Sequence, residues 1–338
     1  MKQFLHTCLK FSLIGVGLMA CLIIGYILLD PFRIIYRYND FSYPSVVPNR
    51  DYISTEMLIQ NQPRHGYNSF ILGSSRTLAF GPDEWRKYLN KDANPYMFDA
   101  SSESTYGIYT KLKFLETQHI PVQNALIILC RDASFLTTVN DTRHLFIKHP
   151  LTSGESPYVF HWYFLKAYLN TKFLSSLYTY TFNGNMKPYM YDYIETRRIT
   201  YDTITNQIHI LDQEKEISEN PIQYYLNRSQ LFYARNAGSI DPTPRINPKH
   251  AELLSEIKRM LEQGHSNYKV VLSPLYDQVK FNPEDLIILK NIFGEHLYNF
   301  SGKNAFTDSI SNYYEASHYR PNVGDSIYKV IYKKPYHL

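Results

Sequence analysis

Cysteine and tryptophan are scarce in this chain of 338 residues, which has 3 Cys and 2 Trp. Cys8 and Cys21 lie in or beside the first apolar run, and Cys130 ends a run that is predicted to be a strand. Three cysteines in these positions do not form a disulfide framework. His144 and His149 are not spaced as ligands on one helical face, and no Cys/His cluster is present, so the sequence predicts no metal site.

A strongly basic or acidic balance is also missing, since the net charge is +4 and no Lys/Arg stripe accompanies it. A nucleic-acid partner is therefore not expected. The glycine-rich loops that hold the phosphates of nucleotides are absent as well, so no cofactor is expected. What remains is an ordinary globular composition, 44% hydrophobic and 20% charged. A chain of this length can bury one large core, or one core with an inserted lobe.

The one long apolar run is Phe11–Leu29, 19 residues without a charge. As a helix it would measure about 28 Å, close to the roughly 30 Å of a bilayer's hydrocarbon core. It follows Lys2 and Lys10, so it could be a signal peptide or an uncleaved anchor. The run is longer than the usual core of a signal peptide, and no small-x-small site follows it before Asp30. We therefore predict a membrane anchor over residues 1–30, with one transmembrane helix.

The rest of the chain alternates short β-rich runs with helical patterns, which favours an open α/β sheet. Helical spacing of apolar residues occurs in Gly107–His119, His250–Gln263 and Pro283–Phe293. We predict a flavodoxin-like, five-stranded parallel sheet with helices on both faces. The predicted strands are Asn68–Leu72, Tyr96–Ala100, Ala125–Cys130, Lys269–Ser273 and Leu297–Phe300.

The predicted organisation has four parts. Residues 31–65 show no sustained period and are expected to form a stalk with one short helix. Residues 66–134 and 248–338 form the α/β domain, and residues 135–247 interrupt it as an aromatic-rich insertion, expected to be a cap lobe. Within the insertion, Arg198–Leu211 alternates polar and apolar residues around a hairpin turn. The chain has 31 Tyr, which suits either sugar binding or a half-buried, polar-rimmed core.

A candidate nucleophile lies where the first predicted strand ends, in the sequence Gly73-Ser74-Ser75-Arg76. The carboxyl end of a parallel strand is where open α/β sheets place their sites. Glycine permits a sharp turn there, and the amides that open the next helix can stabilise a developing oxyanion. A serine in this position is also a common helix cap.

A candidate base lies near the C-terminus, after the fifth predicted strand, where Glu315 precedes His318 by three residues. All parallel strands point the same way, so a loop after the fifth strand can approach the end of the first. Glu315 could then orient the imidazole ring of His318.

With these two blocks the sequence resembles the SGNH (GDSL-like) hydrolase superfamily. It is most similar to the membrane-anchored branch that includes D-alanyl-lipoteichoic-acid transfer proteins and alginate O-acetylation proteins. The resemblance covers about residues 66–134 and 268–331. The matching segments are Phe70–Arg76, Val271–Leu275, Asn312–Tyr314, Ser317–Pro321 and Val323–Gly324.

The resemblance implies that Ser75 is the nucleophile, with Ser74 ranked second, and that His318 is the general base. The family usually has Asp three residues before this histidine, whereas this chain has Glu315. The family also tends to offer Gly and Asn as oxyanion donors after the second and third strands. This chain has Asp99–Glu103 and Cys130–Asp132 in those places.

The remaining candidate site residues lie in or beside these blocks. Ser102 could supply a second oxyanion donor. Arg76 and Arg131 could hold an anionic substrate, or they could pair with Asp132 and Glu103.

The first function that the resemblance implies is serine-dependent acyl transfer or ester hydrolysis, typically of O-acetyl groups, on a cell-envelope or exported polysaccharide. The competing hypothesis is a catalytically inactive protein with the same fold that binds glycans or supports an envelope complex. The resemblance places the body on the extracytoplasmic side of a bacterial cytoplasmic membrane. Its expected partners are the membrane, a carbohydrate polymer and, where the family's scheme applies, a membrane acyltransferase.

Overall fold

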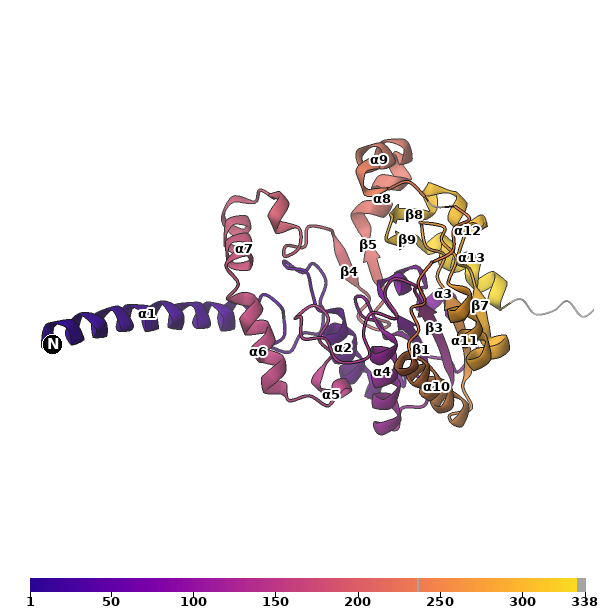
Figure 1. Cartoon of the computed structure of the whole chain (residues 1–338), viewed down its shortest axis with the longest axis horizontal. Coiled ribbons are helices and arrows are strands. Elements are labelled where there is room, and N and C mark those ends of the chain that lie inside the picture. Colours follow the sequence, from indigo (N-terminus) through magenta and orange to yellow (C-terminus); the bar gives the residue numbers. More distant parts are fainter. Residues whose placement is uncertain (236, 333–338) are drawn as a thin grey trace, which may run out of the picture.

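The computed structural model of the chain describes residues 1–235 and 237–332. Residues 236 and 333–338, which fall in the predicted insertion and domain, lie outside the described residues. At the centre is a five-stranded parallel sheet (Figure 1). Its strands pair in the order β2-β1-β3-β6-β7. Each predicted β-rich run overlaps one strand. The strands are β1 (Ser69–Gly73), β2 (Pro95–Met97), β3 (Asn124–Leu129), β6 (Asn267–Leu272) and β7 (Leu297–Asn299).

Helices cover both faces of this sheet. They are α2 (Arg50–His65), α3 (Pro82–Arg86), α4 (Thr105–Thr117), α10 (Pro248–Gln263), α11 (Pro283–Phe293), α13 (Pro321–Ile331) and the 3-10 helix η1 (Ser75–Ala79). Phe70 and Leu72 of β1 pack in one cluster with α2, α4, α10 and α11. Ile71 points to the other face and packs with η1, α3 and α13. The predicted α/β fold with helices on both faces of a parallel sheet is confirmed, as are the three predicted helices.

Residues 31–65, which were expected to form a stalk, are folded into the body. The main element of this segment is α2, which begins after Asn49, whose side chain accepts a hydrogen bond from the Tyr52 amide at 2.8 Å. Ile53, Met57 and Leu58 of α2 are buried in the same cluster as β1. Their spacing puts these three side chains on one face of the helix, which gives α2 its place against the sheet.

The helix α1 (Lys2–Leu29) projects from one end of the body (Figure 1). Within residues 1–235 and 237–332, it is the one helix long and apolar enough to cross a membrane, and a signal sequence would have the same length and composition. The predicted N-terminal apolar helix is therefore confirmed. Where α1 meets the body, Tyr26 packs with Phe32 and with residues of the chain between β3 and β6 in a separate aromatic cluster.

The segment between β3 and β6 packs in two different parts of the body. Its first helices pack with Tyr26 and Phe32 beside the end of α1, whereas Ile199, Ile208 and Ile217 pack in the cluster that covers the sheet. The predicted hairpin is confirmed, because β4 (Ile199–Tyr201) and β5 (Ile208–Ile210) pair antiparallel. In chain order the elements are α5 (Pro150–Ser153), α6 (Pro157–Tyr168), α7 (Thr171–Asn183), η2 (Pro188–Met190), β4 (Ile199–Tyr201), β5 (Ile208–Ile210), α8 (Leu211–Glu219), α9 (Pro221–Asn227) and η3 (Ser229–Leu231).

A small hairpin between β7 and α13 completes the described fold. Its strands, β8 (Tyr313–Glu315) and β9 (His318–Tyr319), pair antiparallel with Glu315 opposite His318. The helix α13 then packs against η1 so closely that a Cβ atom at Gly324 would lie 1.8 Å from the Ala79 carbonyl oxygen. Glycine at this position therefore brings the C-terminal block against the turn that carries Ser75. The elements are η4 (Gly294–His296), α12 (Ala305–Asp308), η5 (Ile310–Asn312), β8 (Tyr313–Glu315) and β9 (His318–Tyr319).

Candidate active site

Ser75 opens η1 at the carboxyl end of β1, as the turn sequence predicts. Gly73 has a φ of +150°, and a Cβ atom there would lie 2.6 Å from the Ile128 carbonyl oxygen, so only glycine fits this bend. Ser74 is fully buried, and its hydroxyl lies 3.3 Å from the Cys130 sulfur. Ser75 is half-buried and faces the C-terminal hairpin. The bend therefore turns one serine into the fold and leaves the other beside the candidate base.

His318 lies within hydrogen-bonding distance of Ser75. The Ser75 Oγ and the His318 Nε2 are 2.8 Å apart, although the two residues are 243 positions apart in the sequence. On the far side of the ring, His318 Nδ1 contacts the Glu315 carboxylate. With the proton on Nδ1, Nε2 can accept a hydrogen bond from the serine hydroxyl. The structure thus brings Ser75, His318 and Glu315 into one hydrogen-bonded chain.

Glu315 reaches the imidazole because of the β8–β9 hairpin. The hairpin pairs Glu315 with His318 across the two strands, so the carboxylate needs only to span the gap between strands. Its second oxygen accepts hydrogen bonds from the amides of Ser317, at 2.5 Å, and His318, at 3.1 Å. Burial alone would raise the pKa of the Glu315 carboxyl, but these hydrogen bonds and the His318 side chain hold that pKa below its usual value. The carboxylate therefore stays charged and fixed in orientation.

A row of buried polar side chains fixes the strand that carries His318. The Cys130 sulfur lies 3.2 Å from the Ser273 hydroxyl, which lies 3.1 Å from the Tyr319 hydroxyl. With Ser74, these groups cross the carboxyl ends of β1, β3 and β6 beneath the site. The role of Tyr319 is not apparent from the sequence, in which the only signal is that Cys130 and Ser273 each end a predicted strand. The row ties β9, and with it His318, to the sheet.

The backbone amides that could stabilise an oxyanion form a less complete set than the Ser75–His318–Glu315 contacts. The amide of Ser75 begins η1, where backbone N–H groups have no partner within the helix. At the neighbouring strand ends, the Ala100 amide donates to the Gly73 carbonyl at 3.2 Å, and the Cys130 amide donates to the Ser134 hydroxyl at 2.8 Å. These two amides are therefore already engaged, whereas the Ser75 amide belongs to the residue whose hydroxyl faces His318 and can serve as an oxyanion donor.

Arg76 pairs with Asp132, one of the two arrangements that the sequence suggests. The guanidinium makes two parallel hydrogen bonds to the carboxylate, at 2.9 and 2.6 Å. Arg76 is buried, whereas the Asp132 side chain is 48% exposed. Asp132 is therefore the member of the pair that solvent or a substrate can reach.

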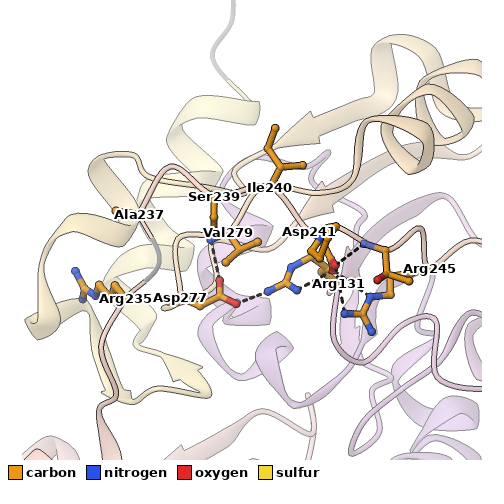
Figure 2. Close-up of a pocket in the computed structure, with 11 residues that line it drawn as sticks. Arg131, Arg235, Ala237, Ser239, Ile240, Asp241, Arg245, Asp277 and Val279 are labelled. Carbon is orange, nitrogen blue, oxygen red and sulfur yellow. Dashed lines mark hydrogen bonds and ion pairs between the residues drawn. The ribbon is translucent and has the colours of Figure 1, made fainter.

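Arg131 pairs with neither Asp132 nor Glu103. Its guanidinium lies between Asp241, at 2.9 Å, and Asp277, as Figure 2 shows. Arg245 binds the same Asp241 carboxylate at 3.0 Å. These residues line a hollow of about 740 Å³. The two carboxylates offset the charge of Arg131, and both come from parts of the chain more than 100 residues away, which is why the sequence did not indicate them.

Ser102 and Glu103 face a different part of the molecule. Ser102 has a φ of +48° and lines a small hollow of about 90 Å³ together with Lys148. Glu103 is fully buried and pairs with Lys111 at 2.8 Å and with Lys148. The predicted pairing of Glu103 with an arginine is therefore corrected to a pairing with two lysines.

The assembled geometry can perform general-base chemistry at a serine. A neutral imidazole at 2.8 Å from Ser75 Oγ can take its proton, and the Glu315 carboxylate stabilises the imidazolium that results. Among residues 1–235 and 237–332, His, Cys, Asp and Glu side chains form no group of three or more that could hold a metal ion. A scan against protein-family models and a search of curated proteins each found no match to this chain.

Proposed function

We propose that this protein is a membrane-anchored serine hydrolase or O-acyltransferase of the SGNH type. The observation that carries the proposal is the chain of contacts from Ser75 to His318 to Glu315. The strand order β2-β1-β3-β6-β7 supports it, because it is the order of flavodoxin-like sheets, whose ligands bind beyond the carboxyl ends of the strands. Ser75 lies at such an end, directly after the inner strand β1.

In the proposed reaction, Ser75 Oγ attacks the carbonyl carbon of an ester while His318 Nε2 takes the hydroxyl proton. The negative charge that develops on the carbonyl oxygen is stabilised by the Ser75 amide. The tetrahedral intermediate then collapses, and His318 gives the proton to the leaving alcohol, which produces an acyl-serine. Water or a sugar hydroxyl, deprotonated by the same imidazole, attacks the acyl group and restores Ser75.

The proposed substrate is an O-acylated cell-envelope or exported polysaccharide, with acetyl as the acyl group. Attachment to a membrane through α1, on the extracytoplasmic side of a bacterial cytoplasmic membrane, would hold the site close to such a polymer. A membrane acyltransferase is a suitable partner if the protein transfers acyl groups instead of hydrolysing them. The substrate and the partner rest on the family resemblance, and the tyrosine-rich composition of the chain is compatible with sugar binding.

A second function, glycan binding without catalysis, is favoured by one observation. The amides of Ala100 and Cys130, at the strand ends where the family places oxyanion donors, are engaged in other hydrogen bonds. Removal of one oxyanion donor from a hydrolase costs about 100- to 1000-fold in rate. A protein with this site could therefore bind an acetylated glycan and turn it over very slowly.

The experiment that separates the two functions measures turnover of p-nitrophenyl acetate and release of acetate from an acetylated polysaccharide by the full chain in detergent. Steady release of acetate, or its transfer to added glycan, supports the enzyme. Saturable binding of the polysaccharide without release of acetate from either substrate would instead establish the binding protein.

Replacing Glu315 by glutamine is expected to lower the turnover number (kcat) by about 1000- to 10,000-fold. The amide cannot stabilise the imidazolium, and its NH2 group favours the wrong ring tautomer. KM should change little, because Glu315 contacts His318 and backbone amides. Steady-state kinetics on p-nitrophenyl acetate measures both constants. Glu252→Gln, an exposed carboxylate on α10, is the matched control and should retain the wild-type rate. If Glu315→Gln and Glu252→Gln had the same kcat, Glu315 would have no role in the mechanism.

A further inference from the structure

The helix α6 exposes large apolar side chains on its outer surface. Tyr158 is 88% exposed, Val159 41% and Trp162 59%. Their spacing of three and four residues places them side by side on one face of the helix, and we call this set the α6 aromatic surface. Lys166 continues the same row one turn further and is exposed. Aromatic side chains beside a lysine are typical of the interface between membrane and water.

The opposite face of α6 is packed into the body. Phe160, Phe164 and Tyr168 are buried there, and Phe164 stacks edge-on against Phe32 with 5.2 Å between the ring centres. These three residues are the buried side chains that α6 contributes to the core. The apolar side chains of Tyr158, Val159 and Trp162 lie outside it, so packing within the fold does not explain why they are apolar.

The same helix contacts the end of α1. The rings of Tyr26 and Tyr168 lie 5.1 Å apart. A Cβ atom at Gly25 would lie 3.2 Å from the hydroxyl oxygens of both Tyr168 and Tyr178, and these two hydroxyls are hydrogen-bonded to each other at 2.8 Å. Figure 1 shows α6 and α7 at the end of the body from which α1 projects.

The depth of this contact follows from the length of the apolar run. The charge-free residues end at Leu29, so Gly25 lies about 6 Å inside the run at a rise of 1.5 Å per residue. If Phe11–Leu29 spans the hydrocarbon core, Tyr168 and Tyr178 touch α1 below the membrane surface. Amphipathic interfacial helices lie at a similar depth, roughly 5–10 Å into the boundary between headgroups and acyl chains.

The junction between α1 and the body is also held in one orientation. The Asp30 carboxylate accepts hydrogen bonds from the amides of Ile34, Ile35 and Tyr36, at 3.0 to 3.1 Å. These bonds fix the turn that follows α1. A body fixed to its anchor in this way presents the same surface to the bilayer.

From these observations we propose that α6 is a second membrane contact, and that the α6 aromatic surface inserts into the lipid interface beside α1. The occupant of this surface is the bilayer itself. The contact holds the body against the membrane, with the carboxyl ends of the strands at a constant distance from it.

The two tryptophans of the chain make a direct test possible, because Trp85 is fully buried and Trp162 is exposed. The full chain would be placed in nanodiscs of phosphatidylcholine whose acyl chains carry bromine at the sixth and seventh carbons, and in unbrominated nanodiscs. Comparison of the wild type with Trp162→Phe isolates the emission of Trp162. We expect bromine to remove most of that emission and to leave the emission of Trp85 unchanged.

A control reporter is placed at the opposite end of the body. Ile287 on α11 is 58% exposed, and Figure 1 shows α11 far from α1. In the Trp162→Phe background, Ile287→Trp should be insensitive to brominated lipid and accessible to aqueous iodide. The proposal is overturned if Trp162 keeps its emission in brominated nanodiscs, since the surface would then face water or a protein partner.

Discussion

Replacing His318 by alanine is expected to lower kcat for p-nitrophenyl acetate by about 10,000-fold or more. The imidazole is the group that lies 2.8 Å from the Ser75 hydroxyl, and without it no side chain in the hydrogen-bonded chain can take the proton. The serine would have to react as a neutral hydroxyl, which is a weak nucleophile. Residual activity would come from substrate binding and the Ser75 amide.

The matched control is His209→Ala, because His209 is an exposed histidine on β5. It should retain the wild-type rate. Both variants should unfold at the same denaturant concentration as the wild type, because His318 is half-buried and belongs to none of the apolar clusters. A His318→Ala protein that is folded and retains more than about a tenth of the activity would exclude the general-base role.

Replacing Lys111 by methionine is expected to lower the free energy of unfolding by about 3–5 kcal/mol. The Lys111 ammonium is fully buried and lies 3.2 Å from Asp51 and 2.8 Å from Glu103. Methionine has a similar length but, among the described residues, leaves Lys148 as the one remaining ammonium partner of the two buried carboxylates. Chemical unfolding in detergent measures the loss. Lys113→Met, an exposed site on the same helix, should stay within about 0.5 kcal/mol of the wild type.

The loss of unfolding free energy in Lys111→Met should depend on pH. Burial alone would raise the pKa of Asp51, but Lys111 and Lys148 outweigh it and hold that pKa below its usual value. In the wild type Asp51 therefore stabilises the fold above its unfolded pKa, and this contribution is lost as the pH falls through the lower folded pKa. Without Lys111, burial disfavours the charged form of Asp51 in the folded protein. The difference in unfolding free energy between wild type and variant should be largest at neutral pH. It should shrink as the pH falls towards about 4, because protonation then removes the charge of the Asp51 carboxylate. A difference that does not change with pH would contradict this account.

This buried cluster also supports the site. The Lys111 ammonium donates to the Asp99 carbonyl at 2.7 Å. The Asp99 carboxylate pairs with Arg50 and accepts a hydrogen bond from the Thr77 hydroxyl of η1 at 3.2 Å. The charges therefore connect α2 and α4 to the turn that carries Ser75. Disturbing them should loosen η1 as well as the fold.

The sheet could be predicted from the sequence because its signals are local. Runs such as Ala125–Cys130 and Lys269–Ser273 are apolar on both faces, which is typical of covered parallel strands. The hairpin of β4 and β5 also has a local pattern. The packing of α2 was not predicted, because the apolar face formed by Ile53, Met57 and Leu58 is interrupted by many polar residues.

The candidate site was predicted in part, because some of its residues also have local sequence signals. Ser75 has a local signal at the end of β1 and His318 has one in the segment that follows β7, and the carboxyl ends of parallel strands lie at the same edge of the sheet. The partners of Arg131 have no such signal, because Asp241 and Asp277 come from distant segments. The same holds for Lys148, one of the two lysines that pair with Glu103. The role of Tyr319 depends on the register of β9, which a sequence pattern does not specify.

The most direct test of the central claim is covalent labelling of the full chain with a fluorophosphonate probe, followed by mass spectrometry of the labelled peptide. The account predicts a label on Ser75 that is lost in Ser75→Ala and His318→Ala and retained in Ser74→Ala, whose hydroxyl is buried against Cys130. A folded wild-type protein that takes no label, beside a reactive control hydrolase, or a label on another serine, would contradict the assignment of Ser75 as an activated nucleophile.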